Sequence, residues 1–540
     1  VGIRDGKLVA VGEALGKATR TIDAKGQVVA PGFVDIHTHY DAQVIWDRML
    51  TISPWHGVTS VVMGNCGFSV APTRPEHTDI IVRTLENVEG MTVAALKEGL
   101  GERWPFETFP QYLDTIENMG TAINVGALIG HTALRMYVMG EDATEREATA
   151  TELNDMSRLV REAMEAGAMG FATSKAATHV GYQGKPVPSR AASFEEMELL
   201  ASQLKVAGRG GVIQATVGRG LSFDEFVKLN QASGCAVSWT ALLAGIALNK
   251  GSAHDQLVRS SELIKAGHNV VPQVSPRALN FEYQLKAPFV LEAMRMFKPV
   301  SEADAEGKKR YYADPEFRAK LWEKLDQGVP PAFRNSFAGT VISEVNDEPA
   351  LHERKLFDVA AERGVTPVDL LFDLGLKTDL QARFRMPVAN HEEDEVEELL
   401  RSPDTVIGLS DAGAHASQLC DACATTYMLR RWVREKKVLG LEQAVRMLTS
   451  RPAEVFNITD RGRLEAGLAG DVVIFNPDTV SDGPLQRVYD FPGKSDRLIS
   501  EATGIDAVIV NGEPIRQHNE DLVNASGPLP GRLLRNGRAQ

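Results

Sequence analysis

The sequence predicts an α/β protein built on a (β/α)8 barrel, with a small β-sandwich domain formed from both chain ends. Short apolar runs alternate with long amphipathic helical patterns, and eight such runs occur in succession. Eight β-then-α units favour a closed barrel over an open sheet. A doubly wound sheet is the alternative, but no glycine-rich phosphate loop follows the first strand.

The predicted barrel strands are short and apolar on both faces, as buried parallel strands are. They lie at Phe33–Ile36, Ser60–Met63, Ile123–Ile129, Ala168–Ala172, Gly211–Ala215, Cys235–Ser238, Asn269–Val274 and Thr405–Leu409. Several helices between them open with the spacing of a capping box, in which Thr144 pairs with Glu147, Ser193 with Glu196 and Ser222 with Glu225. We place the barrel at residues 31–455.

The spacing between strands seven and eight is much longer than the others. It runs for 130 residues, from Ser275 to Asp404, and a structureless loop of that length is uncommon. Helical patterns occur inside it at Pro315–Leu325 and Glu392–Leu400. We therefore predict a helical insertion at residues 278–400, positioned to cover the mouth of the barrel.

Both chain ends have the texture of β structure. Short apolar runs lie at Lys7–Val11, Gln27–Ala30, Asp471–Phe475 and Asp506–Val510, and Asn511-Gly512 is a strong hairpin signal. Neither end can bury a core alone. We expect residues 1–30 and 456–540 to form one small β-domain together.

Composition restricts the class of protein and its partners. The chain has 540 residues, 43% of them hydrophobic, and a formal net charge of −14, which argues against nucleic acid or an anionic membrane as the main partner. Four cysteines are too few for a disulfide framework, so we expect a cytoplasmic protein. We expect its partner to be a small-molecule substrate. We find no transmembrane run, and the sequence leaves a homo-oligomer open. The chain begins at Val1 rather than Met, so we expect part of the native N-terminus to be missing.

Polar residues at the strand ends predict a metal site, because a barrel of this kind carries its active site there. Strand one ends in His37-Thr-His39, whose alternate side chains point the same way. Two imidazoles with Asp411, from the end of strand eight, form a zinc site with a position left for water. Asp411 can also take a proton from that water. In the simpler interpretation the histidines are a surface pair and Asp411 caps a helix.

Other strand ends offer candidate substrate contacts. They are His131 after strand three, Lys175 after strand four, Thr216 after strand five and Trp239 after strand six, with Arg277 after strand seven. Trp239 can wall a substrate pocket or simply fill the barrel core, and His131 can be a structural histidine. Cys420-Asp-Ala-Cys423 has the C-x-x-C spacing, but it lies in a helical pattern without a second pair.

Several motifs resemble the amidohydrolase superfamily and, within it, the D-aminoacylase branch of N-acyl-D-amino-acid deacylases. They are Ala30-Pro-Gly-Phe-Val-Asp-Ile-His-Thr-His-Tyr-Asp41, the run from Gly57 to Ser69, Gly130-His-Thr-Ala-Leu-Arg135 and the closing run from Arg451 to Gly467. The resemblance implies hydrolysis of N-acyl-D-amino acids, with His37, His39 and Cys66 as metal ligands and Asp411 as ligand and catalytic base.

Two departures from that branch affect the expected metal site. The branch takes further zinc histidines from strands five and six, where this chain has Thr216 and Trp239 or Thr240. We therefore expect about one zinc ion, held by His37, His39 and Asp411 with Cys66 or His131. A carboxylated Lys175 is the alternative ligand. The segment after strand seven also lacks the tyrosine-rich substrate pattern of the branch.

Three functions follow from this reading. The first is a metal-dependent amidohydrolase that cleaves an amide bond of a small molecule, such as an N-acyl-(D-)amino acid. The second keeps the fold and cleaves a lactone, a cyclic imide or a carbamate. The third is a metal-free, non-catalytic homologue, which the two missing histidines favour.

Overall fold

A closed ring of parallel strands forms the centre of the molecule. The computed structural model describes residues 1–12, 16–246, 251–292 and 294–539. Neighbouring strands pair in parallel in chain order, and a bridge between Thr38 and Ala412 joins the last strand to the first. The strands are β4 (Phe33–Asp35), β5 (Val58–Met63), β6 (Asn124–Ala127) with its continuation β7 (Ile129–Gly130), β8 (Gly170–Ser174), β9 (Val212–Thr216), β10 (Ala236–Thr240), β11 (Val270–Val274) and β16 (Val406–Ile407). The predicted (β/α)8 barrel is confirmed.

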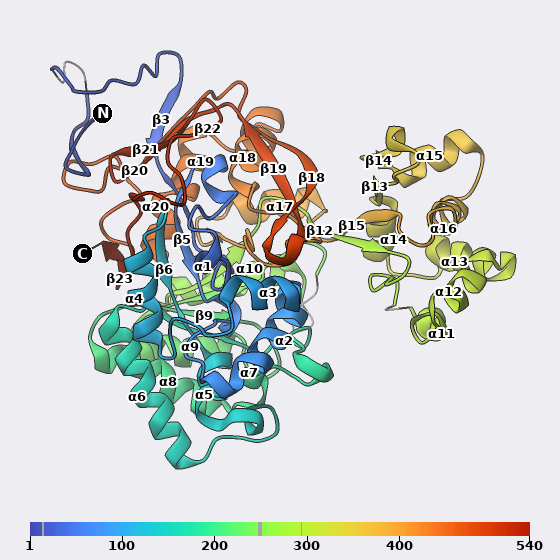
Figure 1. Ribbon diagram of the computed structural model, residues 1–540, viewed down its shortest axis with the longest axis horizontal. Helices are drawn as coiled ribbons and strands as arrows, with labels where there is room; N and C mark the ends of the chain where they lie inside the picture. Colours follow the sequence, from blue (N-terminus) through green and yellow to red (C-terminus); the bar gives the residue numbers. More distant parts are fainter. Residues whose placement is uncertain (13–15, 247–250, 293, 540) are drawn as a thin grey trace.

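Amphipathic helices surround this ring (Figure 1). The main ones are α2 (Thr78–Glu89), α4 (Phe109–Met119), α5 (His131–Met139), α6 (Ala150–Ala166), α8 (Phe194–Ala207), α9 (Phe223–Ser233), α10 (Ala253–Lys265) and α19 (Leu441–Leu448). Ser193 and Ser222 are the N-caps of α8 and α9. The predicted capping box with Glu225 forms at Ser222, whereas Ser193 only accepts from the backbone N–H of Glu196. The predicted capping box at Thr144 is wrong: the side chain of Thr149 caps α6 and pairs with Glu152 instead. Thr144 ends a short 3-10 turn that precedes this helix.

A five-stranded antiparallel sheet combines both chain ends. Its order is β22-β21-β20-β17-β3, with β3 (Val28–Pro31) from the start of the chain and β17 (Val472–Phe475), β20 (Ile505–Val510), β21 (Glu513–Gln517) and β22 (Glu520–Asp521) from the end. Val473 and Phe475 pack into the barrel core, whereas Val472 and Ile474 form a separate small core with Leu8 of β2 (Lys7–Ala10). The sheet thus uses both faces.

The hairpin between β20 and β21 turns where the sequence predicts it. Asn511 and Gly512 have φ angles of 47° and 84°, and a two-residue turn of this hand matches the twist of the flanking strands. Further along the chain, a longer hairpin of β18 (Ser481–Phe491) and β19 (Ser495–Thr503) extends beside the barrel (Figure 1).

The insertion is a separate lobe with its own core. The prediction of a helical insertion is incomplete, because a four-stranded antiparallel sheet in the order β12-β15-β13-β14 accompanies the helices. Its strands are β12 (Leu279–Gln284), β15 (Arg383–Ala389), β13 (Val341–Glu344) and β14 (Arg354–Lys355), and its helices include α12 (Ala305–Ala313), α13 (Pro315–Gln327), α14 (Pro331–Ala338), α15 (Leu356–Arg363) and α16 (Pro367–Lys377). Two of these strands, β13 and β14, are only four and two residues long, so their alternation is brief.

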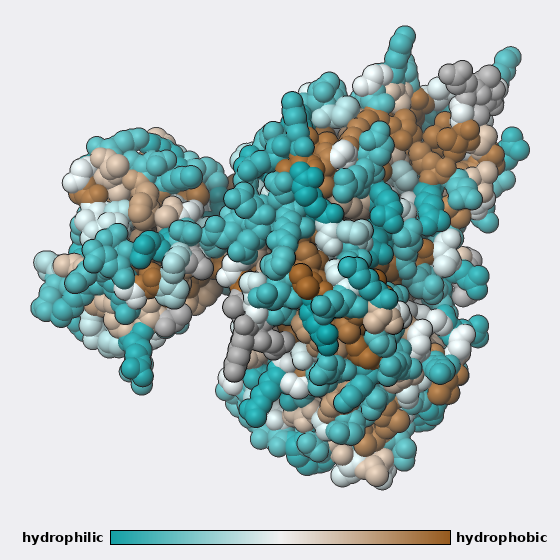
Figure 2. All heavy atoms as spheres, turned by 180° about the vertical axis from the view of Figure 1, so that it is seen from behind, coloured by the Kyte–Doolittle hydropathy of each residue, from teal (hydrophilic) through white to brown (hydrophobic). Residues whose placement is uncertain are grey.

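The lobe stands beside the main body rather than over it, and its connection to the body is narrow (Figures 1 and 2). Hydrophilic residues cover most of the face that Figure 2 shows. Of the described helices, none is both long enough and apolar enough to cross a membrane.

Candidate metal centre and active site

Four side chains predicted from the sequence lie together at the mouth of the barrel. His37 and His39 follow β4, and their Nε2 atoms lie 3.3 Å and 3.7 Å from the same carboxylate oxygen, Oδ1 of Asp411. The Sγ atom of Cys66 lies 3.5 Å from Nε2 of His37. One ligand atom each from His37, His39 and Cys66 falls within a span of 4.8 Å. The folded chain therefore brings a nitrogen, sulfur and oxygen donor set to one point.

Neighbouring side chains orient both imidazoles. Nδ1 of His37 donates to Oε1 of Gln273 at 2.7 Å, because an amide oxygen can only accept. Nδ1 of His39 lies 3.1 Å from Oε1 of the buried Glu89. Each ring therefore has a polar partner at Nδ1, and its Nε2 faces the Asp411 carboxylate. Metal-binding histidines usually have such outer partners.

The surroundings of Cys66 favour the thiolate form of its side chain. Its backbone N–H donates to Oε1 of Gln214 at 2.5 Å. Burial alone would raise the pKa of the thiol, but the charge and hydrogen bond of His37 outweigh burial and lower that pKa to about 7. A thiolate is the form that binds metals. Cys66 is therefore better suited to bind zinc than to act as a small buried apolar residue, which is the more common role of a cysteine.

Asp411 is a carboxylate at neutral pH. Burial would raise its pKa, but the hydrogen bond from His39 and the charges of His37 and His39 lower it to about 2. Its backbone N–H donates to the carbonyl of His37 at 3.1 Å, and the hydroxyl of Ser410 donates to the same carbonyl. The loop after β16 is thus tied to the loop after β4, which fixes the carboxylate beside the imidazoles.

These residues open onto a cavity of about 810 Å³. Its walls combine the four side chains with the hydroxyls of Thr216 and Thr240, the imidazoles of His179 and His415, and a set of apolar residues that includes Phe68, Leu243, Leu279, Phe281, Phe289 and Leu419. The insertion reaches this cavity through Leu279, Phe281 and Phe289 and does not cover it further within the described chain. The cavity is large enough for a small-molecule substrate.

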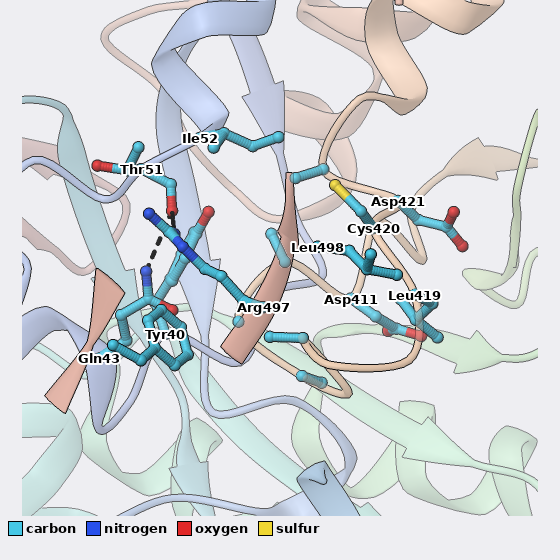
Figure 3. A pocket seen from close by; sticks show the side chains of 16 residues that line it. Tyr40, Gln43, Thr51, Ile52, Asp411, Leu419, Cys420, Asp421, Arg497 and Leu498 are labelled. Carbon is cyan, nitrogen blue, oxygen red and sulfur yellow. Dashed lines mark hydrogen bonds between the residues drawn. The ribbon is translucent and has the colours of Figure 1, made fainter. Parts of the chain in front are cut away.

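A much smaller pocket lies behind the Asp411 loop (Figure 3). Its volume is about 30 Å³, close to that of one water molecule. Arg497 and Gln43 both donate to the carbonyl of Thr51 at its edge. It can hold no substrate, so the larger cavity is the candidate active site.

The ends of β9 and β10 contribute hydroxyls to the cavity. Thr240 donates to Thr216 at 3.1 Å, and Nε2 of Gln214 donates to Thr240 at 3.1 Å. Trp239 lies between inward-facing residues and therefore points outward. It is fully buried, stacks on Phe226 of α9 and donates to Ser260 of α10. The prediction that Trp239 walls the substrate pocket is wrong: it fills the layer between strands and helices.

His131 is a structural residue rather than a substrate contact. Its Nδ1 accepts from Thr173 and its Nε2 donates to Glu196, each at 2.8 Å. Arg135 pairs with the same carboxylate, and all three charged or polar groups are buried. Both ring nitrogens are occupied, and the residue lies outside the cavity wall. The prediction that His131 binds the substrate or the metal is therefore wrong.

Lys175 and Arg277 also point elsewhere. The Lys175 ammonium donates to the carbonyls of Arg190 and Ala192, a role that a carboxylated lysine could not perform because a carbamate has no ammonium protons. Arg277 pairs with Asp421 at 3.1 Å and also contacts Cys423. Neither side chain lines the cavity, so the prediction that Lys175 and Arg277 contact the substrate is wrong. The cysteines at 420 and 423 are free and buried.

Three residues that the sequence analysis missed also shape the site. Glu89 ends α2 and holds His39, while His179 and His415 lie in loops and line the cavity. Loop residues carry no strand or helix periodicity that would place them. Gln214 and Gln273 were detectable, since an amide inside an apolar strand must point at a polar partner.

The chain belongs to the amidohydrolase family, which it matches over residues 20–516. It is 29% identical to the N-acyl-D-glutamate deacylase of Alcaligenes xylosoxydans xylosoxydans over 95% of this chain and 88% of that protein. A solved structure of D-aminoacylase covers 99% of this chain and 95% of its own at 25% identity, with a TM-score of 0.65. The N-acyl-D-glutamate deacylase from Bordetella bronchiseptica, solved with zinc and a phosphonate inhibitor, covers 99% and 94% at 27% identity, with a TM-score of 0.64.

Fold, site and family together define a metal-dependent hydrolase of carbon–nitrogen bonds other than peptide bonds. Within that class the chain falls in the D-aminoacylase branch.

Proposed function

We propose that this protein hydrolyses the amide bond of an N-acyl-D-amino acid with one zinc ion. The observation that carries the proposal is the convergence of His37, His39, Cys66 and Asp411 at the cavity. Relatives named as D-aminoacylase and as N-acyl-D-glutamate and N-acyl-D-aspartate deacylases support the substrate class. The apolar walls favour a substrate with an apolar side chain or acyl group.

The donor set fits zinc. Two imidazole nitrogens, a thiolate and a carboxylate are ligands that zinc accepts. Nε2 of both imidazoles faces the same point, and with the ring protons on Nδ1 both nitrogens would be free to bind the ion. His37, His39, Cys66 and Asp411 would hold the ion. When bound, zinc supplies a Lewis acid that lowers the pKa of a water molecule and polarises the substrate carbonyl.

Asp411 would move the proton in the reaction. As a carboxylate at neutral pH, it accepts a proton from the attacking water while the water oxygen bonds to the carbonyl carbon. It then returns that proton to the amide nitrogen as the carbon–nitrogen bond breaks, which gives a carboxylic acid and a free amine. General acid–base catalysis of this kind typically contributes about 10²–10⁴-fold.

The free cysteines and the acidic composition support a cytoplasmic protein that acts on small molecules and binds neither nucleic acid nor membrane. A homo-oligomer is compatible with this proposal.

The test combines metal analysis with a substrate panel. We expect about one zinc per chain and release of free amine from N-acetyl-D-leucine, with slower release from its L-enantiomer. His254, which is exposed and pairs with Glu398 on the outer surface, gives a matched control: His254→Gln should keep both zinc and activity, whereas His37→Gln should lose zinc.

Three results would contradict the proposal. Full activity in protein without metal would exclude the metal mechanism. Turnover of a lactone, cyclic imide or carbamate without any amide hydrolysis would establish the second function, and a protein that binds no metal and hydrolyses none of these would be the non-catalytic homologue.

A further inference from the structure

We propose that His179 is a catalytic residue that donates a hydrogen bond from Nε2 to the substrate carbonyl oxygen as negative charge develops there. The inference rests on the proposed amide hydrolysis and adds a second electrophile to it. It concerns the half of the mouth formed by β8, β9 and β10, opposite Asp411, where Thr216 and Thr240 end the strands.

We assign the tautomer of His179 from the hydrogen bonds around Ser174. The hydroxyl oxygen of Ser174 lies 2.7 Å from Nδ1 of His179 and accepts from the backbone N–H of Ala176 at 3.2 Å. A serine hydroxyl has a single hydrogen to donate, and Nδ1 of His179 is the acceptor that the structure gives it. Nδ1 is therefore an acceptor, and the ring proton of neutral His179 is on Nε2.

This Nε2–H is a free donor at the cavity. His179 lines the cavity with His37 and Cys66, and within the described residues its Nε2 has no partner. Its ring packs on Phe68, with centroids 4.9 Å apart, and Phe68 follows Cys66 by two residues. A hydrogen bond on one side and an aromatic ring on the other hold the imidazole in place.

The strand register sets His179 on the correct side of the site. Ser174, which anchors it, pairs with Thr216 across β8 and β9, and Thr216 pairs with Thr240 across β9 and β10. Asp411 follows β16, across the barrel. A carbonyl bound between the two halves would present its carbon to a water beside Asp411 and its oxygen to His179.

The surroundings keep His179 neutral. Burial lowers its pKa to about 3, and the nearby charges of His39 and His415 act in the same direction. A neutral imidazole is a donor that needs no deprotonation step, and preorganised donors aimed at a developing oxyanion are among the largest catalytic contributions.

The test compares His179→Leu with His179→Gln, whose side-chain amide can reach the Nε2 position with an N–H. We expect His179→Leu to lower kcat about 10²–10³-fold with little change in KM. It should weaken binding of the N-methylphosphonyl derivative of D-leucine, measured by calorimetry, by a similar factor, because a tetrahedral mimic carries the oxyanion. His179→Gln should recover most of both losses, and zinc content should be unchanged.

Ser174→Ala tests the positioning role. Without the serine donor the ring can adopt either tautomer, so we expect a partial loss of kcat and of phosphonate affinity.

Unchanged kcat and phosphonate affinity in His179→Leu would overturn the proposal. A rise in KM alone would also overturn it, because His179 would then be a ground-state contact, and so would a loss that glutamine does not recover in folded, zinc-containing protein. Failure of the proposed function looks different: the wild-type protein would then hydrolyse no amide in the panel, whatever residue 179 is.

Discussion

The two halves of the barrel mouth are built from the same kind of strand end but offer different chemistry. The half at β4, β5 and β16 presents His37, His39, Cys66 and Asp411. The half at β8, β9 and β10 presents hydroxyls, of which Thr240 donates to Thr216. The comparison teaches that, among the described residues, the imidazole and thiol groups close enough to share a metal ion all lie in the first half. This asymmetry supports the proposed single zinc ion, with hydrogen-bond donors opposite it.

Asp411 gives the strongest test of the difference between the two halves. Asp411→Asn should fold normally, because the amide keeps the size of the carboxylate, and should lower kcat about 10²–10⁴-fold, because an amide accepts no proton from water. Steady-state kinetics with zinc analysis measures this. Near wild-type turnover by a folded, zinc-containing Asp411→Asn protein would remove Asp411 from the role of base.

Trp239 gives a second test of the comparison. It belongs to β10, in the half with the hydroxyls, but its side chain points away from the cavity. Trp239→Ala should cost about 3–5 kcal/mol of unfolding free energy, as truncation of a large buried side chain does, with KM unchanged. Urea denaturation and kinetics separate the two effects. An altered substrate preference at unaltered stability would instead return Trp239 to the pocket.

Glu196 tests the buried charges behind the hydroxyl half. Burial would raise the Glu196 pKa, but hydrogen bonds and charges from His131 and Arg135 lower it to about 2. Its contribution is thus present above the unfolded value of about 4.5 and is lost as the pH falls from there toward 2. Glu196→Gln should cost about 3 kcal/mol at pH 7, because it leaves Arg135 without a buried counter-charge.

Denaturation of both proteins across pH 2–7 checks this, and the difference in stability should shrink through the acid range. A constant difference from pH 7 to pH 2 would show that the charge of Glu196 contributes nothing.

Most of the barrel could be predicted because buried parallel strands are continuous apolar runs, and all eight predicted runs overlap a barrel strand. The helix start at Thr149 was missed because Thr144 has the same spacing to a glutamate. The sheet of the insertion was missed because β13 and β14 are only four and two residues long. Such segments carry too few alternations to separate a strand from a loop.

At the site, prediction succeeded where strand geometry fixes direction and failed elsewhere. His37 and His39 are alternate residues, so their convergence was readable. The same rule, applied to the inward-facing Thr240, would have turned Trp239 outward. His179 sits five residues beyond Ser174 in a loop, and its place depends on a hydrogen bond that the sequence does not display.

The insertion separates part of the cavity wall from the residues proposed to react. Its core is separate from that of the barrel, and two strands, β12 and β15, attach it. Leu279 and Phe281 of β12 nevertheless belong to the wall of the substrate cavity. A change in this lobe can therefore reshape the cavity wall while His37, His39, Cys66 and Asp411 keep their positions.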